Sequence, residues 1–127
     1  MRRLLLGTTL IVAMTATASP QDVDNGKAVF GKCRACHQVG EKARNLVGPS
    51  LNGLFGRKAG TIEGFRYSEA NKTSGIVWDE ATFREYIKNP RAKIPGTKMV
   101  FAGIRDDRDI DDLIAYLKQF GADGKTK

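Results

Sequence analysis

Side chains that bind metals or form cross-links are scarce in this chain of 127 residues. The chain contains two cysteines, one histidine and three methionines. A structural zinc site usually takes four protein ligands, so the cysteines and the histidine together are one short. A single histidine also excludes an iron centre held by two histidines of the same chain. Metal chemistry in this chain therefore has very few side chains to use.

Long apolar runs are equally rare. The one sustained run lies within residues 4–14, behind two arginines, and is followed by small residues that end at Ala18. It is shorter than the roughly 18 residues that a membrane-spanning helix needs. A basic start, a short apolar run and small residues are typical of a secretory signal. We expect residues 1–18 to be cleaved, with the boundary open between 18 and 20, and residues 19–127 to form one domain.

The charge balance is positive. The formal net charge is +7, and Arg2 and Arg3 leave with the signal, so the mature domain carries about +5 (7 minus 2). This favours a partner with an anionic surface, and export from the cytoplasm argues against nucleic acid. An exported chain meets an oxidising compartment, where two free thiols normally become a disulfide.

Helical signals dominate the mature chain, and no segment alternates as a strand. Apolar residues at Ile110, Leu113, Ile114, Leu117 and Phe120 follow a helical period, with Gly121 as the expected stop. Capping residues predict three further helices: Asp24 before residues 25–32, Ser68 before 69–73 and Asp79 before 80–88. Glycine-rich loops connect them. We expect an all-α domain, and loops this long are usually functional or packed against something.

Cys33 and Cys36 stand two residues apart, and His37 follows directly. This spacing suits a redox dithiol, half of a zinc site or covalent haem attachment. A thioredoxin-like dithiol expects neighbouring strands, and a zinc site lacks its second ligand pair. The pattern therefore favours two thioether bonds to haem vinyl groups, with His37 as the proximal iron ligand.

Met99 is the one methionine that remains after export, because Met1 and Met14 lie in the signal. Methionine usually fills gaps in a core, but this one lies in the turn-rich stretch "IPGTKMVFAG". We expect Met99 to be the second axial ligand, which raises the reduction potential relative to a bis-histidine haem. A ligating histidine donates its other ring N–H, and the carbonyl of Pro49 is a plausible acceptor.

Several donors suit the carboxylates of a haem. Arg57, Tyr67 and Trp78 carry guanidinium, phenol and indole donors. On residue type alone, however, each of them is more often a core or surface residue than a haem partner.

The stretches "GKAVFGKCRACHQV", "VGPSLNGLFGRKAG", "YIKNPRAKIPGTKMVFAGI" and "DDLIAYLKQFG" resemble class I cytochromes c. The similarity is to short bacterial members, of the cytochrome c-two type, close to mitochondrial cytochrome c. It covers nearly all of the mature chain. The implied fold crosses its N- and C-terminal helices and wraps shorter helices and loops around one covalent haem.

The resemblance also implies a role for each matching residue. Cys33 and Cys36 match the thioether positions, His37 and Met99 match the axial ligands, and the carbonyl of Pro49 matches the acceptor for the histidine. Arg57, Tyr67 and Trp78 match the propionate partners, with Gly60 nearby. Asn71, Tyr86 and Thr97 match a buried polar network, and Phe101 matches the aromatic residue at the haem edge. Gly26, Phe30, Leu113 and Tyr116 match the crossing of the terminal helices.

The chain departs from the mitochondrial pattern after Ile104, where "RDDRDIDDL" replaces a lysine-rich stretch. The remaining basic set suggested for docking an acidic partner is Lys27, Lys32, Arg91, Lys93, Lys98 and Arg105. Since both axial positions are filled, we expect a monomeric one-electron carrier and not an enzyme. The family suggests a quinol–cytochrome c reductase as donor and a photosynthetic reaction centre or terminal oxidase as acceptor. A haem enzyme or gas binder is the alternative, and it would need Met99 away from the iron.

Overall fold

The computed structural model describes residues 10–15 and 20–127. The expected signal, residues 1–18, lies largely outside this part. Five helices follow one another: Val23–Phe30 (α1), Glu69–Lys72 (α2), Glu80–Lys88 (α3), Pro90–Lys93 (α4) and Asp107–Lys118 (α5). The described residues form no strand beyond two isolated bridges, so the all-α expectation is confirmed. Within the same residues, no helix has the length and apolar character to cross a membrane.

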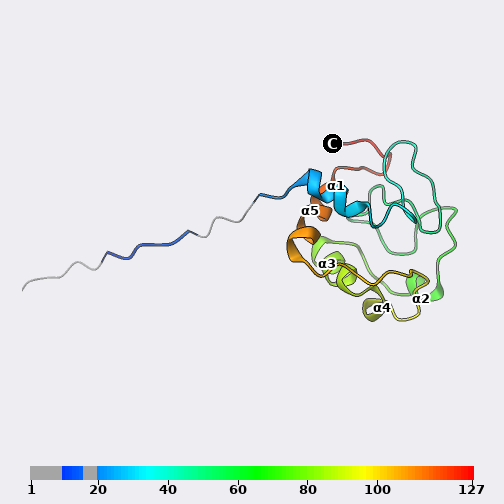
Figure 1. Ribbon diagram of the computed structural model, residues 1–127. Coiled ribbons are helices and arrows are strands. Elements are labelled where there is room, and N and C mark those ends of the chain that lie inside the picture. The colour runs from blue at the N-terminus through cyan, green and yellow to red at the C-terminus, as the bar shows by residue number, and fades with distance from the viewer. Residues whose placement is uncertain (1–9, 16–19) are drawn as a thin grey trace, which may run out of the picture.

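Helices α1 and α5 cross in direct contact, although about 80 residues separate them in the chain. Figure 1 shows the two helices side by side, with the loops that follow α1 (cyan to green) extending away from α5. A Cβ atom on Gly26 would lie 2.0 Å from the Asp112 carbonyl oxygen, so only glycine lets the backbones approach this closely. The Phe30 and Tyr116 rings pack beside this contact, with centroids 5.5 Å apart.

Helix α5 supplies the centre of the core. Its apolar stripe, Ile110, Leu113, Ile114 and Leu117, is at most 1 % exposed, as the helical period predicted. Burial of such side chains stabilises a fold by about 1.5–3 kcal/mol each. The helix ends at Lys118 with Gln119 as its C-cap, so its last residue lies three positions before Gly121, the stop that the sequence indicated.

The caps confirm most of the predicted helix starts. Ser68 and Asp79 accept the backbone N–H groups of Asn71 and Thr82, as expected. The cap of α1 was predicted wrongly: Asp22 accepts from the Asn25 N–H, and Asp24 lies in the first turn. Both aspartates are suitable by type, but only the earlier one has the extended backbone that a cap requires.

Asp112 on α5 ties down the start of α1. Its side chain is 1 % exposed, and Oδ1 accepts the Asp22 backbone N–H at 2.7 Å. Oδ2 accepts from the Asn25 side-chain amide at 2.8 Å. The hydrogen bond from the Asp22 backbone is the main cause that holds the pKa of Asp112 below its usual value.

Replacing Asp112 with asparagine should destabilise the domain by about 1–3 kcal/mol. The new side-chain NH₂ group would then face one of the two donors, the Asp22 N–H or the Asn25 amide, that the carboxylate now accepts. A carboxylate with a lowered pKa stabilises the fold above its unfolded pKa and loses that effect as pH falls through the folded pKa. The difference between wild type and Asp112→Asn should therefore be full at neutral pH and shrink below about pH 4. Urea unfolding at several pH values measures it. Exposed Asp24→Asn is the control, and an equal loss there would contradict the assignment.

Candidate functional site

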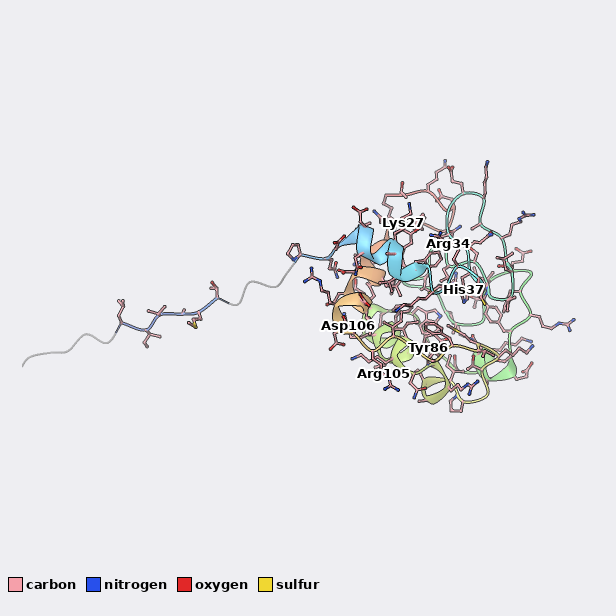
Figure 2. The ribbon with its side chains drawn as sticks, viewed as in Figure 1. Lys27, Arg34, His37, Tyr86, Arg105 and Asp106 are labelled. Carbon is pink, nitrogen blue, oxygen red and sulfur yellow. The ribbon has the colours of Figure 1, made fainter. Side chains whose placement is uncertain are left out.

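A large cavity lies between the helices and the loops. Its volume is about 540 Å³, within the range of small-molecule and cofactor pockets. Figure 2 shows His37 and Tyr86 inside the domain, and Lys27 and Arg105 near its outer surface. The cavity walls are mostly apolar and include the side chains Leu51, Leu54, Phe65, Phe83, Ile87, Leu113 and Leu117. Several of these side chains, such as Leu113 and Leu117, also belong to the hydrophobic core, so core and cavity share a wall.

The structure brings together every cofactor and metal residue that the sequence suggested. The cavity lining contains Cys33, Cys36, His37, Pro49, Arg57, Gly60, Tyr67, Asn71, Trp78, Tyr86, Thr97, Met99 and Phe101. These residues come from α2, from α3 and from the connections α1–α2, α2–α3 and α4–α5, so their meeting is a property of the fold. Of the six suggested docking residues, only Lys32 and Lys98 reach the lining.

His37 is held in one orientation by the loop that faces it. Its Nδ1 lies 2.7 Å from the Pro49 carbonyl oxygen, and since a carbonyl can only accept, Nδ1 carries the proton. A Cβ on Gly48 would lie 2.3 Å from the ring, so this glycine makes room for the imidazole. Burial is the main cause that keeps the pKa of His37 below its usual value. The neutral ring therefore has Nε2 free as a metal ligand.

Met99 enters the cavity from the loop after α4. Its sulfur accepts a hydrogen bond from the Tyr86 hydroxyl at 2.8 Å, and its backbone N–H donates to the Thr97 hydroxyl at 3.2 Å. Burial raises the pKa of Tyr86 to about 12, so this phenol stays a donor at neutral pH. One sulfur lone pair is thus oriented, and a second remains for a metal.

Cys33 and Cys36 lie in a helical turn directly after α1, closed by the Cys36 N–H and His37 N–H bonds to the Cys33 carbonyl. Both thiols are free and partly buried. Burial is the main cause that raises the pKa of Cys33 to about 11, whereas reactive dithiols have lowered values. Among the described residues, no group of three Cys, His, Asp or Glu side chains could hold a metal. These observations favour the cysteines as attachment points.

The three suggested carboxylate partners have different environments. Arg57 donates through Nη1 to the carbonyls of Ser50 and Asn52, both at 3.1 Å, which leaves its other donors available. The Tyr67 hydroxyl accepts the Ile62 N–H at 3.1 Å, so its own proton is free to be donated. Trp78 packs edge-on against Tyr86 with ring centroids 4.8 Å apart.

The suggested polar network is present only as separate contacts. Asn71, Tyr86 and Thr97 all line the cavity, but Tyr86 donates to Met99, and Thr97 accepts from Met99. The Asn71 Oδ1 atom is buried and, within the described part of the chain, has no hydrogen-bond partner. A buried acceptor of this kind normally has one, so it indicates a group or a water within the cavity.

Sequence reasoning missed the apolar walls. Leu46, Val47 and Val100 line the cavity mouth and are 44 %, 78 % and 84 % exposed. Leu113 and Leu117 belong to the predicted helical stripe, which was not expected to reach a cavity. The signal available was the presence of large apolar residues inside glycine-rich loops, which periodicity does not detect.

The suggested docking cations also differ from one another. Lys93 pairs with Glu85 at 2.6 Å, so part of its charge is offset within this chain. On the neighbouring α3–α5 face, Lys88 pairs with Asp107 at 2.7 Å, Arg84 pairs with Asp111, and Lys118 pairs with Glu80. Exposed Lys32 and Lys98 make no ion pair within the described residues, and they flank the cavity mouth.

The residues present fit a haem. The cavity is largely apolar with a few convergent polar groups, and one end has a neutral imidazole with a free Nε2. Met99 supplies a thioether, and the thiols of Cys33 and Cys36 lie just before the histidine in the chain. The orphaned Asn71 acceptor and the spare donors of Arg57 and Tyr67 are polar groups that such a ligand or its waters can satisfy.

Known proteins match this chain along its length. The family model described as Cytochrome c matches residues 23–121. "Cytochrome c2" from Blastochloris viridis is 58 % identical over 127 residues, which is 100 % of both chains. "Cytochrome c2" from Rhodoplanes tepidamans is 68 % identical over 107 residues, covering 84 % of this chain and all of the other. The solved structure of cytochrome c2 from Rhodospirillum centenum aligns with a TM-score of 0.75 at 40 % identity, covering 79 % of this chain and 98 % of that one.

Proposed function

Because this chain belongs to the cytochrome c family, we propose that it is a periplasmic one-electron carrier with His37 and Met99 as the axial ligands of its haem. Membership brings one covalently bound c-type haem and an electron-transfer role, not an enzymatic one. The observation that carries the ligand proposal is the shared cavity: the oriented His37 ring and the Met99 sulfur line the same space as Cys33 and Cys36.

Each group of residues has a distinct task in this proposal. When bound, the haem supplies the reversible one-electron chemistry of its iron. Cys33 and Cys36 would hold it through two thioether bonds, one from each thiol. Pro49 holds the His37 ring, and Tyr86 orients the Met99 sulfur. Arg57, Tyr67 and Trp78 would hold the propionates through their donor groups. The apolar walls would exclude water, which favours the less charged reduced state.

A carrier follows from this ligand set because both axial positions come from the chain. No position remains where a substrate could bind the iron, whereas electron transfer needs only a rigid cofactor and a brief docking contact. The cavity mouth, flanked by Phe101 and the exposed Val47 and Val100, is where a partner can approach closely.

The cellular context is also part of the proposal. Residues 1–18 act as an export signal with its boundary between 18 and 20, and residues 19–127 form the mature domain. The donor is a quinol–cytochrome c reductase, and the acceptor is a photosynthetic reaction centre or a terminal oxidase. The mature protein works as a monomer in transient electrostatic complexes.

Two measurements on the purified, exported protein test the function. Intact mass under denaturing conditions should show one haem covalently added to the mature chain. The oxidised protein should show the near-infrared band of methionine-to-iron charge transfer at neutral pH. A band that is absent while covalent haem is present would support the haem enzyme or gas binder instead. A mass without haem would refute both.

The docking cations give a second expected result. Lys32→Gln should slow oxidation of the reduced protein by an acidic acceptor several-fold at low salt, and flatten its dependence on ionic strength, because a charge beside the mouth steers encounter. Stopped-flow spectroscopy with reaction-centre or oxidase preparations measures it. Lys88→Gln is the matched control, because it removes the same charge from an ion pair with Asp107. Equal slowing in both variants would contradict docking at the mouth.

A further inference from the structure

Residues 119–127 fold back as a hydrogen-bonded hairpin, here called the C-terminal strap. After α5 ends, the Gly121 N–H donates to the Lys125 carbonyl at 3.0 Å, and the Lys127 N–H donates to the Gln119 carbonyl at 2.9 Å. Phe120 and Thr126 form an isolated antiparallel bridge. The strap lies outside the cavity lining, so the proposed function gives it no task.

The strap packs on the loop that carries Pro49. The Phe120 carbonyl accepts the Gly53 N–H at 3.1 Å, and a Cβ on Gly53 would lie 2.9 Å from the Ala122 Cα. On the other side, a Cβ on Gly124 would lie 2.2 Å from the Gly40 carbonyl oxygen. Gly124 is buried in a segment of exposed residues and has φ +77°. Glycines on both sides therefore allow backbone-to-backbone contact.

The peptide group between Asn52 and Gly53 links this contact to the cavity. Its N–H donates to the strap carbonyl of Phe120 at 3.1 Å, and its C=O accepts from Arg57 Nη1 at 3.1 Å. In a planar trans peptide these two groups point in opposite directions, so fixing one end fixes the other. The Asn52 side chain also makes two hydrogen bonds to the Gly40 backbone: it accepts from the N–H and donates to the carbonyl, both at 2.9 Å.

We propose that the C-terminal strap positions Arg57, and through Arg57 sets the charge beside the haem. This inference rests on the proposed function, since it assigns the strap a part in tuning that haem. A cation held in a partly buried site stabilises the redox state with one more electron. Rotation of the Asn52–Gly53 peptide would release one of the two carbonyls that hold the guanidinium. The strap therefore keeps the midpoint potential higher than a chain without it would have.

Two strap variants and one matched control test the proposal. The first variant lacks residues 122–127, and the second is Gly124→Ala, whose new Cβ would overlap Gly40. The control is Gly75→Ala, because Gly75 also has a positive φ, +70°, but nothing lies within 4 Å of a Cβ built there. Redox titration gives the midpoint potential of each holoprotein, and hydrogen exchange reports the Gly53 amide. Both strap variants should lower the potential and speed Gly53 exchange, and the control should do neither.

Repeating the deletion in Arg57→Lys protein distinguishes an effect that acts through Arg57 from a general loosening of the domain. If the strap acts through Arg57, deleting residues 122–127 in Arg57→Lys should produce no further drop in potential, because coupled changes are not additive. A full additional drop would overturn the proposal, as would faster Gly53 exchange with an unchanged potential. Failure of the proposed function looks different: the wild-type mass would then lack covalent haem, whereas failure of this inference leaves a working carrier.

Discussion

Met99→Ala should turn the carrier into an open haem protein. The variant removes the thioether that Tyr86 orients at 2.8 Å, and residues 19–127 contain no other methionine. Because neutral sulfur favours the reduced iron, the midpoint potential should fall. The fall should be comparable with the difference in reduction potential between haems with and without a methionine ligand. The reduced variant should also bind carbon monoxide, which the wild type should not.

Spectroscopy and redox titration check this result. The near-infrared band of the oxidised protein should disappear in Met99→Ala, and a carbon monoxide spectrum should appear on reduction. Val100→Ala is the control, because its side chain is 84 % exposed at the neighbouring position and offers no ligand. An unchanged potential in Met99→Ala would show that another group binds the iron.

Gly26→Ala should be among the most destabilising single substitutions in the protein. At an ordinary helical position this change stabilises by about 1 kcal/mol. Here the added Cβ would meet the Asp112 carbonyl oxygen at 2.0 Å and the Tyr116 Cβ at 2.8 Å. Backbone cannot move aside without separating α1 from α5, so the net loss should reach about 3 kcal/mol or more.

Denaturant unfolding of the holoprotein measures that loss. The reverse substitution Ala28→Gly, at an exposed position of the same helix, calibrates helix propensity and should cost about 1 kcal/mol. If Gly26→Ala proved neutral or stabilising, the two helices would not be in backbone contact.

Much of the fold followed from local signals. Residues 80–88 were predicted as a helix with Asp79 as its cap, and the structure has the same bounds, because cap, apolar stripe and Pro90 all agree. The start of α1 was two residues off, since Asp22 and Asp24 are chemically equal as caps and only the tertiary contact to Asp112 distinguishes them. Helix α4 was missed because four residues are too short for periodicity to reveal.

For the candidate site, the sequence suggested some residues, whereas other contacts could not be predicted from it. Cys33, Cys36 and His37 lie close together in sequence, and their spacing narrowed the chemistry to three kinds of site. The lack of predicted strands and of a second zinc-ligand pair then favoured haem attachment. Met99 followed by elimination, because so few ligand types exist in the chain. The contacts of Arg57 could not be predicted, since they depend on carbonyls whose direction only the folded loop fixes. Ion pairs such as Lys93–Glu85 could not be predicted either, because they join residues of different helices.

The double use of the core has a consequence for how this protein is made. Leu54, Phe83, Ile87, Leu113 and Leu117 are buried core residues and also walls of the cavity. A chain without its cofactor would have a hollow centre of about 540 Å³, and large voids are costly in a small domain. We therefore expect cofactor attachment and folding to be coupled, so the amount of folded protein should depend on the supply of the cofactor.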